Sequence, residues 1–211
     1  MRIVVLGTGT DVGKTYVTAC LARGLAEHRS VLALKPIESG VDPHAPGDAG
    51  TIAAAAGHAP LHSRWRFEPP VSPHLAARMA GTSIDPAQVA QWVADQERFE
   101  SPEVTIVELA GGALSPLAAD VTNVELALGL GPAVWLLVAP DSLGVLHDLT
   151  ATLRCLPRPP DAVVLSRARP ADASTGTNAL ELQRLGIAEV LEVIPEGATS
   201  CPGTVAWLLG R

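Results

Sequence analysis

Short apolar segments of strand length alternate with segments of helix length along most of the 211 residues, and this alternation limits the possible folds more than any other feature of the chain. Six segments are predicted to be strands: residues 2–6, 31–34, 104–107, 133–138, 162–165 and 189–194. Helices are predicted at residues 14–28, at a short segment starting near 48, and at residues 85–98, 142–156, 177–185 and 203–209. Because such alternation builds βαβ units, we predict an α/β fold: a doubly wound, mostly parallel sheet with helices on both faces, in one domain over residues 1–211.

The composition and charge narrow the class of protein. No apolar run reaches the roughly 18 residues that would span a bilayer, and the first residues lack the pattern of a signal peptide. Three widely spaced cysteines offer no disulfide framework, which fits a reducing compartment. The net charge of −7, without a basic run, argues against nucleic acid as a main partner. We therefore expect a cytoplasmic protein that binds small molecules rather than nucleic acid or a membrane.

Residues 7–15 form the most informative motif, GTGTDVGKT, between the first predicted strand and the first predicted helix. Small residues let the backbone wrap a phosphate, so that successive N–H groups and the start of the helix face its oxygens. Lys14 can then reach the β- and γ-phosphates, while the Thr15 hydroxyl can ligate Mg²⁺. Five residues rather than four separate Gly7 from Gly13, so the strict P-loop pattern is not met. The alternative is a glycine-rich turn that only caps the helix, but the motif favours a fold of the P-loop NTPase type.

Lysine is scarce in this chain, which contains 13 arginines but only two lysines, Lys14 and Lys35. Lys35 directly follows the predicted strand 31–34, and the carboxyl ends of parallel strands face the crevice where ligands bind. A compact ammonium there can stabilise charge on a transferring phosphoryl group, a task for which arginine is not equivalent. The scarcity of lysine makes a functional role for Lys35 a better hypothesis than an ordinary solvated charge at a strand end.

Two acidic residues are candidates for binding Mg²⁺. Glu108 follows the predicted strand 104–107, at the point where P-loop proteins carry a carboxylate that holds the metal. Asp48 has two possible roles, N-cap of the following helix or metal ligand.

Ser72, which precedes Pro73, is predicted to be a simple helix cap. The six histidines show no metal-ligand spacing, so no transition metal is expected.

Taken in order, these segments resemble the dethiobiotin synthetase family. The family's motifs GTxTxVGKT, KPxxSG, PxSPHxAA and VEGAGG correspond here to GTGTDVGKT, KPIESG, PPVSPHLAA and VELAGG, nearly collinear from Met1 to about Leu149. The resemblance implies that 7,8-diaminopelargonate, CO₂ and ATP give dethiobiotin, ADP and phosphate with Mg²⁺ as cofactor. One amine would form a carbamate, ATP would phosphorylate it, and the second amine would close the ureido ring. The resemblance also implies a homodimer.

The same resemblance implies roles for individual residues. Charge on the phosphate and the carbamate would be neutralised by Lys14 and Lys35, which with Thr10 are the predicted catalytic residues. The diamine or the carbamate would contact Thr10 and Ser39. The predicted Mg²⁺ ligands are Thr15, Asp48 and Glu108. The predicted nucleotide contacts are Asp11, Val12, Gly13, Lys14, Thr15, Tyr16, Asp48, Glu108 and Gly111.

Three residues depart from the family pattern and keep alternatives open. Leu109 and Leu146 stand where the family has glycine and asparagine, and Ser166 stands where it often has an asparagine that reads the nucleotide base. Because leucine disfavours a positive φ, the direction of Glu108 is open, and Ser166 leaves other nucleoside triphosphates as possible cosubstrates. One alternative is a partitioning-type P-loop ATPase switch, against which Gly9 argues because those ATPases carry a lysine there. The other is a related P-loop ligase with a different amine substrate.

Overall fold

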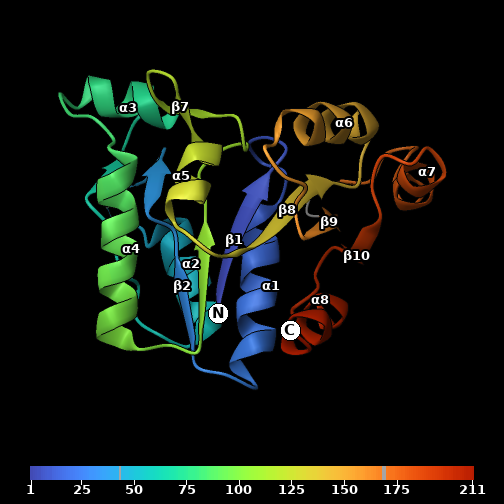
Figure 1. The fold of residues 1–211 in the computed structure, drawn as a ribbon, viewed down its shortest axis with the longest axis horizontal. Helices are drawn as coiled ribbons and strands as arrows, with labels where there is room; N and C mark the ends of the chain where they lie inside the picture. Colours follow the sequence, from blue (N-terminus) through green and yellow to red (C-terminus); the bar gives the residue numbers. More distant parts are fainter. Residues whose placement is uncertain (43, 168–169) are drawn as a thin grey trace.

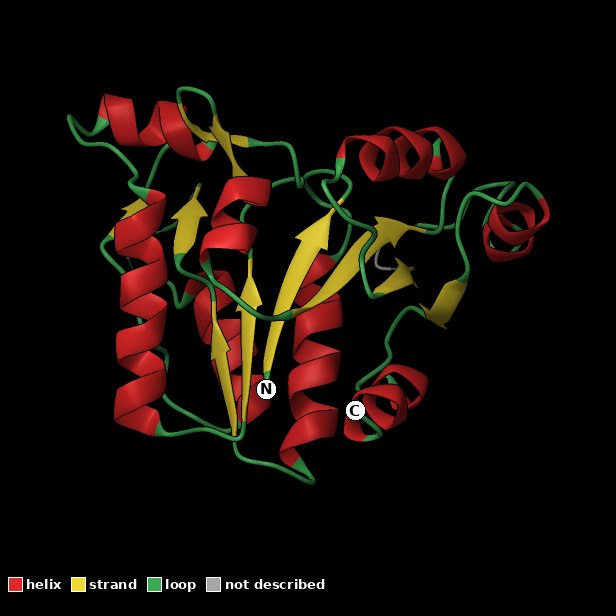
Figure 2. Ribbon diagram, in the orientation of Figure 1, coloured by secondary structure: helices red, strands yellow, loops and turns green. Residues whose placement is uncertain are grey.

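The computed structural model describes residues 1–42, 44–167 and 170–211. Within these ranges, six strands form a parallel sheet in the order β10-β9-β8-β1-β5-β2 (Figure 1; Figure 2). The strands are β1 Arg2–Gly7, β2 Val31–Leu34, β5 Val104–Glu108, β8 Val134–Pro140, β9 Ala162–Ser166 and β10 Val190–Ile194. Every predicted strand has its counterpart in this sheet, and the predicted α/β fold class is confirmed.

Helices cover both faces of the sheet because alternate residues of a strand point to opposite sides. In β1, Ile3 and Val5 belong to one hydrophobic core, and Val4 and Leu6 belong to another. The first core includes residues of α1 Lys14–Ala26, α2 Gly47–Ala56 and α8 Pro202–Leu209. The second includes residues of α3 Pro73–Met79, α4 Pro86–Glu100, α5 Asn123–Gly129, α6 Val145–Cys155 and α7 Asn178–Arg184. No helix in the described ranges is long and apolar enough to cross a lipid bilayer.

Several short elements are not apparent from the sequence pattern. The helix α5 has seven residues, too few for a clear period, although Thr122 and Glu125 form a capping box at its start. Two small sheets also lack a sequence signal, because strands of two or three residues show no alternation. They pair β3 Ile37–Ser39 with β4 Trp65–Phe67 in parallel, and β6 Pro116–Ala118 with β7 Val121–Thr122 in antiparallel orientation.

The starts of two helices differ from the predicted caps. The N-cap of α2 is Pro46, so Asp48 lies in the first turn and the N-cap role considered for it is wrong. Ser72 occupies the N-cap position of α3, but its hydroxyl makes no capping hydrogen bond. That hydroxyl lies 3.1 Å from Nδ1 of His74 instead. Neither side chain therefore makes the capping hydrogen bond that the sequence suggested.

Candidate active site

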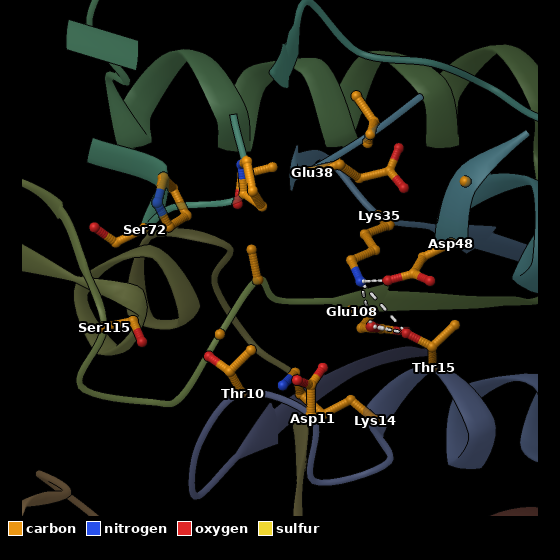
Figure 3. A pocket seen from close by; sticks show the side chains of 18 of the residues that line it. Thr10, Asp11, Lys14, Thr15, Lys35, Glu38, Asp48, Ser72, Glu108 and Ser115 are labelled. Carbon is orange, nitrogen blue, oxygen red and sulfur yellow. Dashed lines mark hydrogen bonds and ion pairs between the residues drawn. The ribbon is translucent and has the colours of Figure 1, made fainter. Parts of the chain in front are cut away.

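A cavity of about 980 Å³ opens at the carboxyl ends of β1, β2 and β5 (Figure 3). Its volume lies near the upper end of the range for small-molecule sites in proteins. The walls come from the loop before α1, the segment after β2, the first turn of α2, the segment before α3 and the loop after β5. Open parallel sheets bind ligands at this edge because loops leaving neighbouring strands in different directions enclose a crevice.

The loop between β1 and α1 has the backbone that a phosphate-binding turn requires. Gly13, the N-cap of α1, has a φ of 91°, which glycine adopts without strain. Gly7 is constrained by space instead, since a Cβ built there would lie 2.9 Å from side-chain atoms of Lys14 and Val12. The ammonium of Lys14 donates a hydrogen bond of 2.9 Å to the carbonyl oxygen of Gly9 and so folds back over the loop. The positive end of α1 and a lysine ammonium therefore belong to the same turn.

Lys35 follows β2 directly and lies among three side chains that carry oxygen. Its ammonium is 2.9 Å from Glu108 Oε1 and 3.4 Å from Thr15 Oγ1, and it forms an ion pair with Asp48. The Thr15 hydroxyl also donates to Glu108 Oε1 at 2.7 Å. Figure 3 shows these four side chains converging on one point. The structure thus brings the three predicted metal ligands together, with a lysine ammonium between them.

Glu108 is completely buried at the end of β5, an uncommon location for a carboxylate. Its Oε2 atom is buried without a hydrogen-bond partner among the described residues. Leu109, which left the direction of this carboxylate open, does not adopt a positive φ and packs in the core. Its N–H donates to the carbonyl oxygen of Val5 at 3.1 Å, which extends the pairing of β5 with β1. The positive φ of this segment is found at Gly111, at 73°, so the leucine leaves Glu108 directed into the cavity.

The two lysines differ in how firmly they hold their protons. Burial lowers the pKa of Lys14 to about 8, and repulsion from Lys35 adds to this effect while attraction by Glu108 opposes it. Burial would also lower the pKa of Lys35, but the carboxylates of Glu108 and Asp48 outweigh it and raise that pKa above its ordinary value. Burial would raise the pKa of Asp48, but contact with Lys35 reverses this and lowers it. One ammonium is therefore held by carboxylates, while an incoming anion would stabilise the charge of the other.

Most of the residues predicted to bind nucleotide or substrate lie on the wall of this cavity. The lining includes Thr10, Asp11, Gly13, Lys14, Thr15, Tyr16, Lys35, Ser39, Asp48, Glu108 and Gly111. Val12 does not belong to the lining, because its side chain is buried in the core around α1. Ser166 is buried at the end of β9, and Leu146 lies on α6 and packs against the second core, so neither lines the cavity.

Sequence patterns assign no role at the site to several polar residues of the lining, among them Glu38, Ser72 and Ser115. The hydroxyl of Ser115 accepts a hydrogen bond of 2.8 Å from the backbone N–H of Gly112 and so holds the turn after β5. Ser72 belongs to the SPH segment of the family motif. Without that motif, a serine directly before Pro73 suggests only a helix cap. Glu38 and Ser115 lie close in the sequence to Lys35 and Gly111, whereas Ser72 reaches the cavity because a distant segment of chain folds back to it.

Comparison with known proteins places the chain among its relatives. A family model described as "AAA domain" matches residues 1–200. The ATP-dependent dethiobiotin synthetase BioD of Streptomyces coelicolor is 36% identical over 204 residues, which cover 94% of this chain and 85% of that protein. The protein of the same name from Methylobacterium nodulans is 35% identical over 226 residues, which cover 92% of this chain and 98% of that protein.

Solved structures share the fold at much lower sequence identity. The signal recognition particle receptor FtsY from Elizabethkingia anophelis superposes with a TM-score of 0.63 at 15% identity, over 94% of this chain and 60% of that chain. A ParA family ATPase from Chlorobium tepidum TLS gives a TM-score of 0.57 at 13% identity, over 99% and 97% of the two chains. At these identities the likeness supports the P-loop NTPase-like parallel architecture alone.

Proposed function

The chain belongs to the dethiobiotin synthetase family, and we propose that it uses ATP to convert 7,8-diaminopelargonate and CO₂ into dethiobiotin, releasing ADP and phosphate. One observation carries the residue-level proposal: two lysines and two carboxylates converge on one cavity, namely Lys14, Lys35, Asp48 and Glu108. Phosphoryl transfer needs positioning and charge stabilisation more than covalent help from the protein. A preorganised group of opposite charges is suited to that task.

The triphosphate is assigned to the loop before α1. Backbone N–H groups of residues 11–16, at the start of that helix, would bind the phosphate oxygens. The ammonium of Lys14 would exchange its hydrogen bond to the Gly9 carbonyl for one to a phosphate oxygen. The new bond would be stronger because the acceptor is charged. The adjacent Gly111 turn also lines the cavity and approaches the Thr10 hydroxyl.

Mg²⁺ is proposed to accompany the nucleotide at Thr15, Asp48 and Glu108. The buried Oε2 of Glu108, which has no hydrogen-bond partner in the described part of the chain, and the nearby oxygens of the other two residues fit this ion. Mg²⁺ prefers such oxygens and completes its coordination with water and phosphate oxygens. When bound, the ion would neutralise charge on the transferring phosphoryl group. Lys35, released from these oxygens, would then be able to contact the second substrate.

Lys35, Thr10 and Ser39 are assigned to the second substrate. One amine of the diamine combines with CO₂ to form a carbamate, whose oxygen attacks the γ-phosphorus while ADP leaves. The second amine then attacks the carbonyl carbon of the carbamic phosphate, and phosphate leaves as the ureido ring closes. The ammonium of Lys35 stabilises negative charge on the carbamate and on the transferring phosphoryl group. The hydroxyls of Thr10 and Ser39, both on the cavity wall, contact the diamine or the carbamate.

Mass spectrometry tests the reaction directly. Dethiobiotin should form when the protein is incubated with diaminopelargonate, bicarbonate and Mg·ATP, and omission of any one of them should abolish it. Other nucleoside triphosphates, tested in turn, measure the base preference that Ser166 leaves open. Nucleotide hydrolysis independent of the diamine and bicarbonate would support an ATPase switch instead. Turnover with a different diamine only would indicate a ligase with a changed substrate.

A homodimer is proposed as the working form, as the family resemblance implies. The exposed side chains of Leu114 and Leu143 follow β5 and β8, at the same edge of the sheet as the cavity, and offer apolar surface to a second copy. Sedimentation should give about twice the chain mass of 21.8 kDa. A monomer at concentrations where the enzyme is fully active would contradict this proposal.

A further inference from the structure

Glu38 is a buried carboxylate on the cavity wall that the reaction proposed above does not use. Its side chain is 3% exposed and forms an ion pair of 3.0 Å with Nε of Arg66. Its other oxygen accepts a hydrogen bond of 3.1 Å from the backbone N–H of Ala49, in the first turn of α2. We propose that Glu38, held by Arg66, is a positioning residue that fixes this turn and thereby aims Asp48 at the Mg²⁺ site. The inference rests on the proposed function, since it requires that Asp48 bind the ion.

The first turn of α2 has no cap of its own. Its N-cap, Pro46, has no side-chain acceptor, so the free N–H groups of the turn need an acceptor from elsewhere. Glu38 supplies one from β3, and the positive end of the helix favours a carboxylate there. A Cβ built on Gly47 would lie only 2.8 Å from Glu38 Oε1, which shows how closely the turn wraps this carboxylate. The conformation at the start of α2 therefore depends on Glu38.

Arg66 keeps Glu38 in this role. The two residues face each other across the parallel pairing of β3 and β4. A carboxylate this deeply buried requires a positive partner, and Arg66 is the partner that the structure provides. Because its charge is already neutralised, Glu38 is better suited to hold backbone than to bind an amine of the substrate.

Asp48 depends on that backbone for its direction. It directly precedes Ala49, and its side chain is half exposed, so packing restrains it little. In Figure 3, Lys35 and Asp48 lie between Glu38 and the phosphate loop. Removing the partner that orients a metal ligand commonly weakens metal binding by about 10- to 100-fold. We expect the same of Glu38, although it touches neither the ion nor the nucleotide.

The Mg²⁺ dependence of ADP binding tests this role. Calorimetric titrations of ADP at a series of Mg²⁺ concentrations, and in EDTA, separate metal binding from nucleotide binding. Mg²⁺ should enhance ADP binding, and Glu38→Ala should raise the Mg²⁺ concentration that gives half of this enhancement by about 10-fold or more. The affinity for ADP in EDTA should change by less than about twofold. Glu38→Gln keeps an oxygen for the Ala49 N–H but loses the charge that Arg66 requires. It should shift the Mg²⁺ dependence in the same direction by a smaller factor.

Glu192 provides a matched control, because its carboxylate accepts hydrogen bonds from the N–H groups of Gly203 and Thr204 and so caps α8 outside the cavity lining. Glu192→Ala should lower thermal stability without changing the Mg²⁺ dependence. The proposal is overturned if Glu38→Ala only loses stability, as the control does, and binds Mg·ADP like the wild type. If Glu38→Ala does not fold, the Mg²⁺ dependence and the stability of Glu38→Gln are compared with those of Glu192→Ala and the wild type in the same way. If wild-type ADP binding does not respond to Mg²⁺, the proposed metal site itself fails, and the role of Glu38 with it.

Discussion

The ammonium of Lys35 lies 2.9 Å from Oε1 of Glu108, a carboxylate with no solvent exposure. Lys35 directly follows β2 and Glu108 ends the neighbouring strand β5, so the pairing of the two strands holds both in place. Asp48 approaches the same ammonium from the first turn of α2. A buried carboxylate requires a positive charge nearby, and either Lys35 or a divalent cation can supply it.

Replacing Lys35 with methionine should leave Glu108 buried without its positive partner. We expect the free energy of unfolding in urea, measured without metal, to fall by about 3 kcal/mol. Mg²⁺ should restore part of this loss and stabilise the variant more than the wild type, because the ion takes the place of the ammonium. Arg2→Met, which breaks the ion pair with Glu97 elsewhere, should show no such response to Mg²⁺. Equal stabilisation of Lys35→Met and the wild type would contradict the exchange.

Replacing Lys35 with arginine should impair turnover more than nucleotide binding. The planar guanidinium is bulkier than an ammonium and should displace the carbamate, so we expect kcat to fall by about 100-fold, while the affinity for ATP changes only a few-fold. Steady-state kinetics and calorimetry measure the two effects separately. Lys14→Arg is the contrasting variant and should weaken ATP binding. A normal rate in Lys35→Arg would remove Lys35 from the mechanism.

Replacing Thr15 with valine removes the hydroxyl that donates to Glu108 at 2.7 Å and nearly keeps the side-chain volume. We expect the affinity for Mg·ADP to fall by about 10-fold, because one oxygen ligand of the proposed metal site is lost. Thr15→Ser retains the hydroxyl and should behave like the wild type. Titration at low Mg²⁺ measures the difference, and an unchanged affinity of Thr15→Val would refute the ligand role.

Nucleotide binding should take up a proton near pH 8, because the pKa of Lys14 is lowered to about 8 in the free protein. The phosphates should raise this pKa, so about half a proton is taken up at pH 8 and almost none at pH 6. Affinity should therefore fall as the pH rises above 8. Calorimetry of ADP binding in EDTA, in buffers with different ionisation enthalpies, measures the uptake. Lys14→Arg carries a permanent charge and should show none; uptake unchanged in that variant would assign the proton to another group.

The strands and the longer helices could be predicted because their signals lie within a few neighbouring residues. The apolar run of β8 and the capping aspartate of α4, Asp85, are legible without any knowledge of the rest of the chain. The helix α5 and the pairing of β3 with β4 could not be predicted, since such short segments are stabilised by what they pack against rather than by their own pattern. Leu109 shows a further limit of the sequence. It departs from the family motif beside Glu108, but in the structure its side chain is buried in the core and does not obstruct the site.

The sequence by itself determined the order of strands and helices, the phosphate-binding turn, and the residue types available for charge stabilisation. Only the tertiary structure decided which of these residues meet. Thr15 and Glu108 are 93 positions apart yet share a hydrogen bond, because β1 and β5 pair side by side. The structure also decided that Asp48 faces Lys35 rather than capping its helix. Such contacts arise from the packing of distant segments into a common sheet, and local sequence patterns do not encode them.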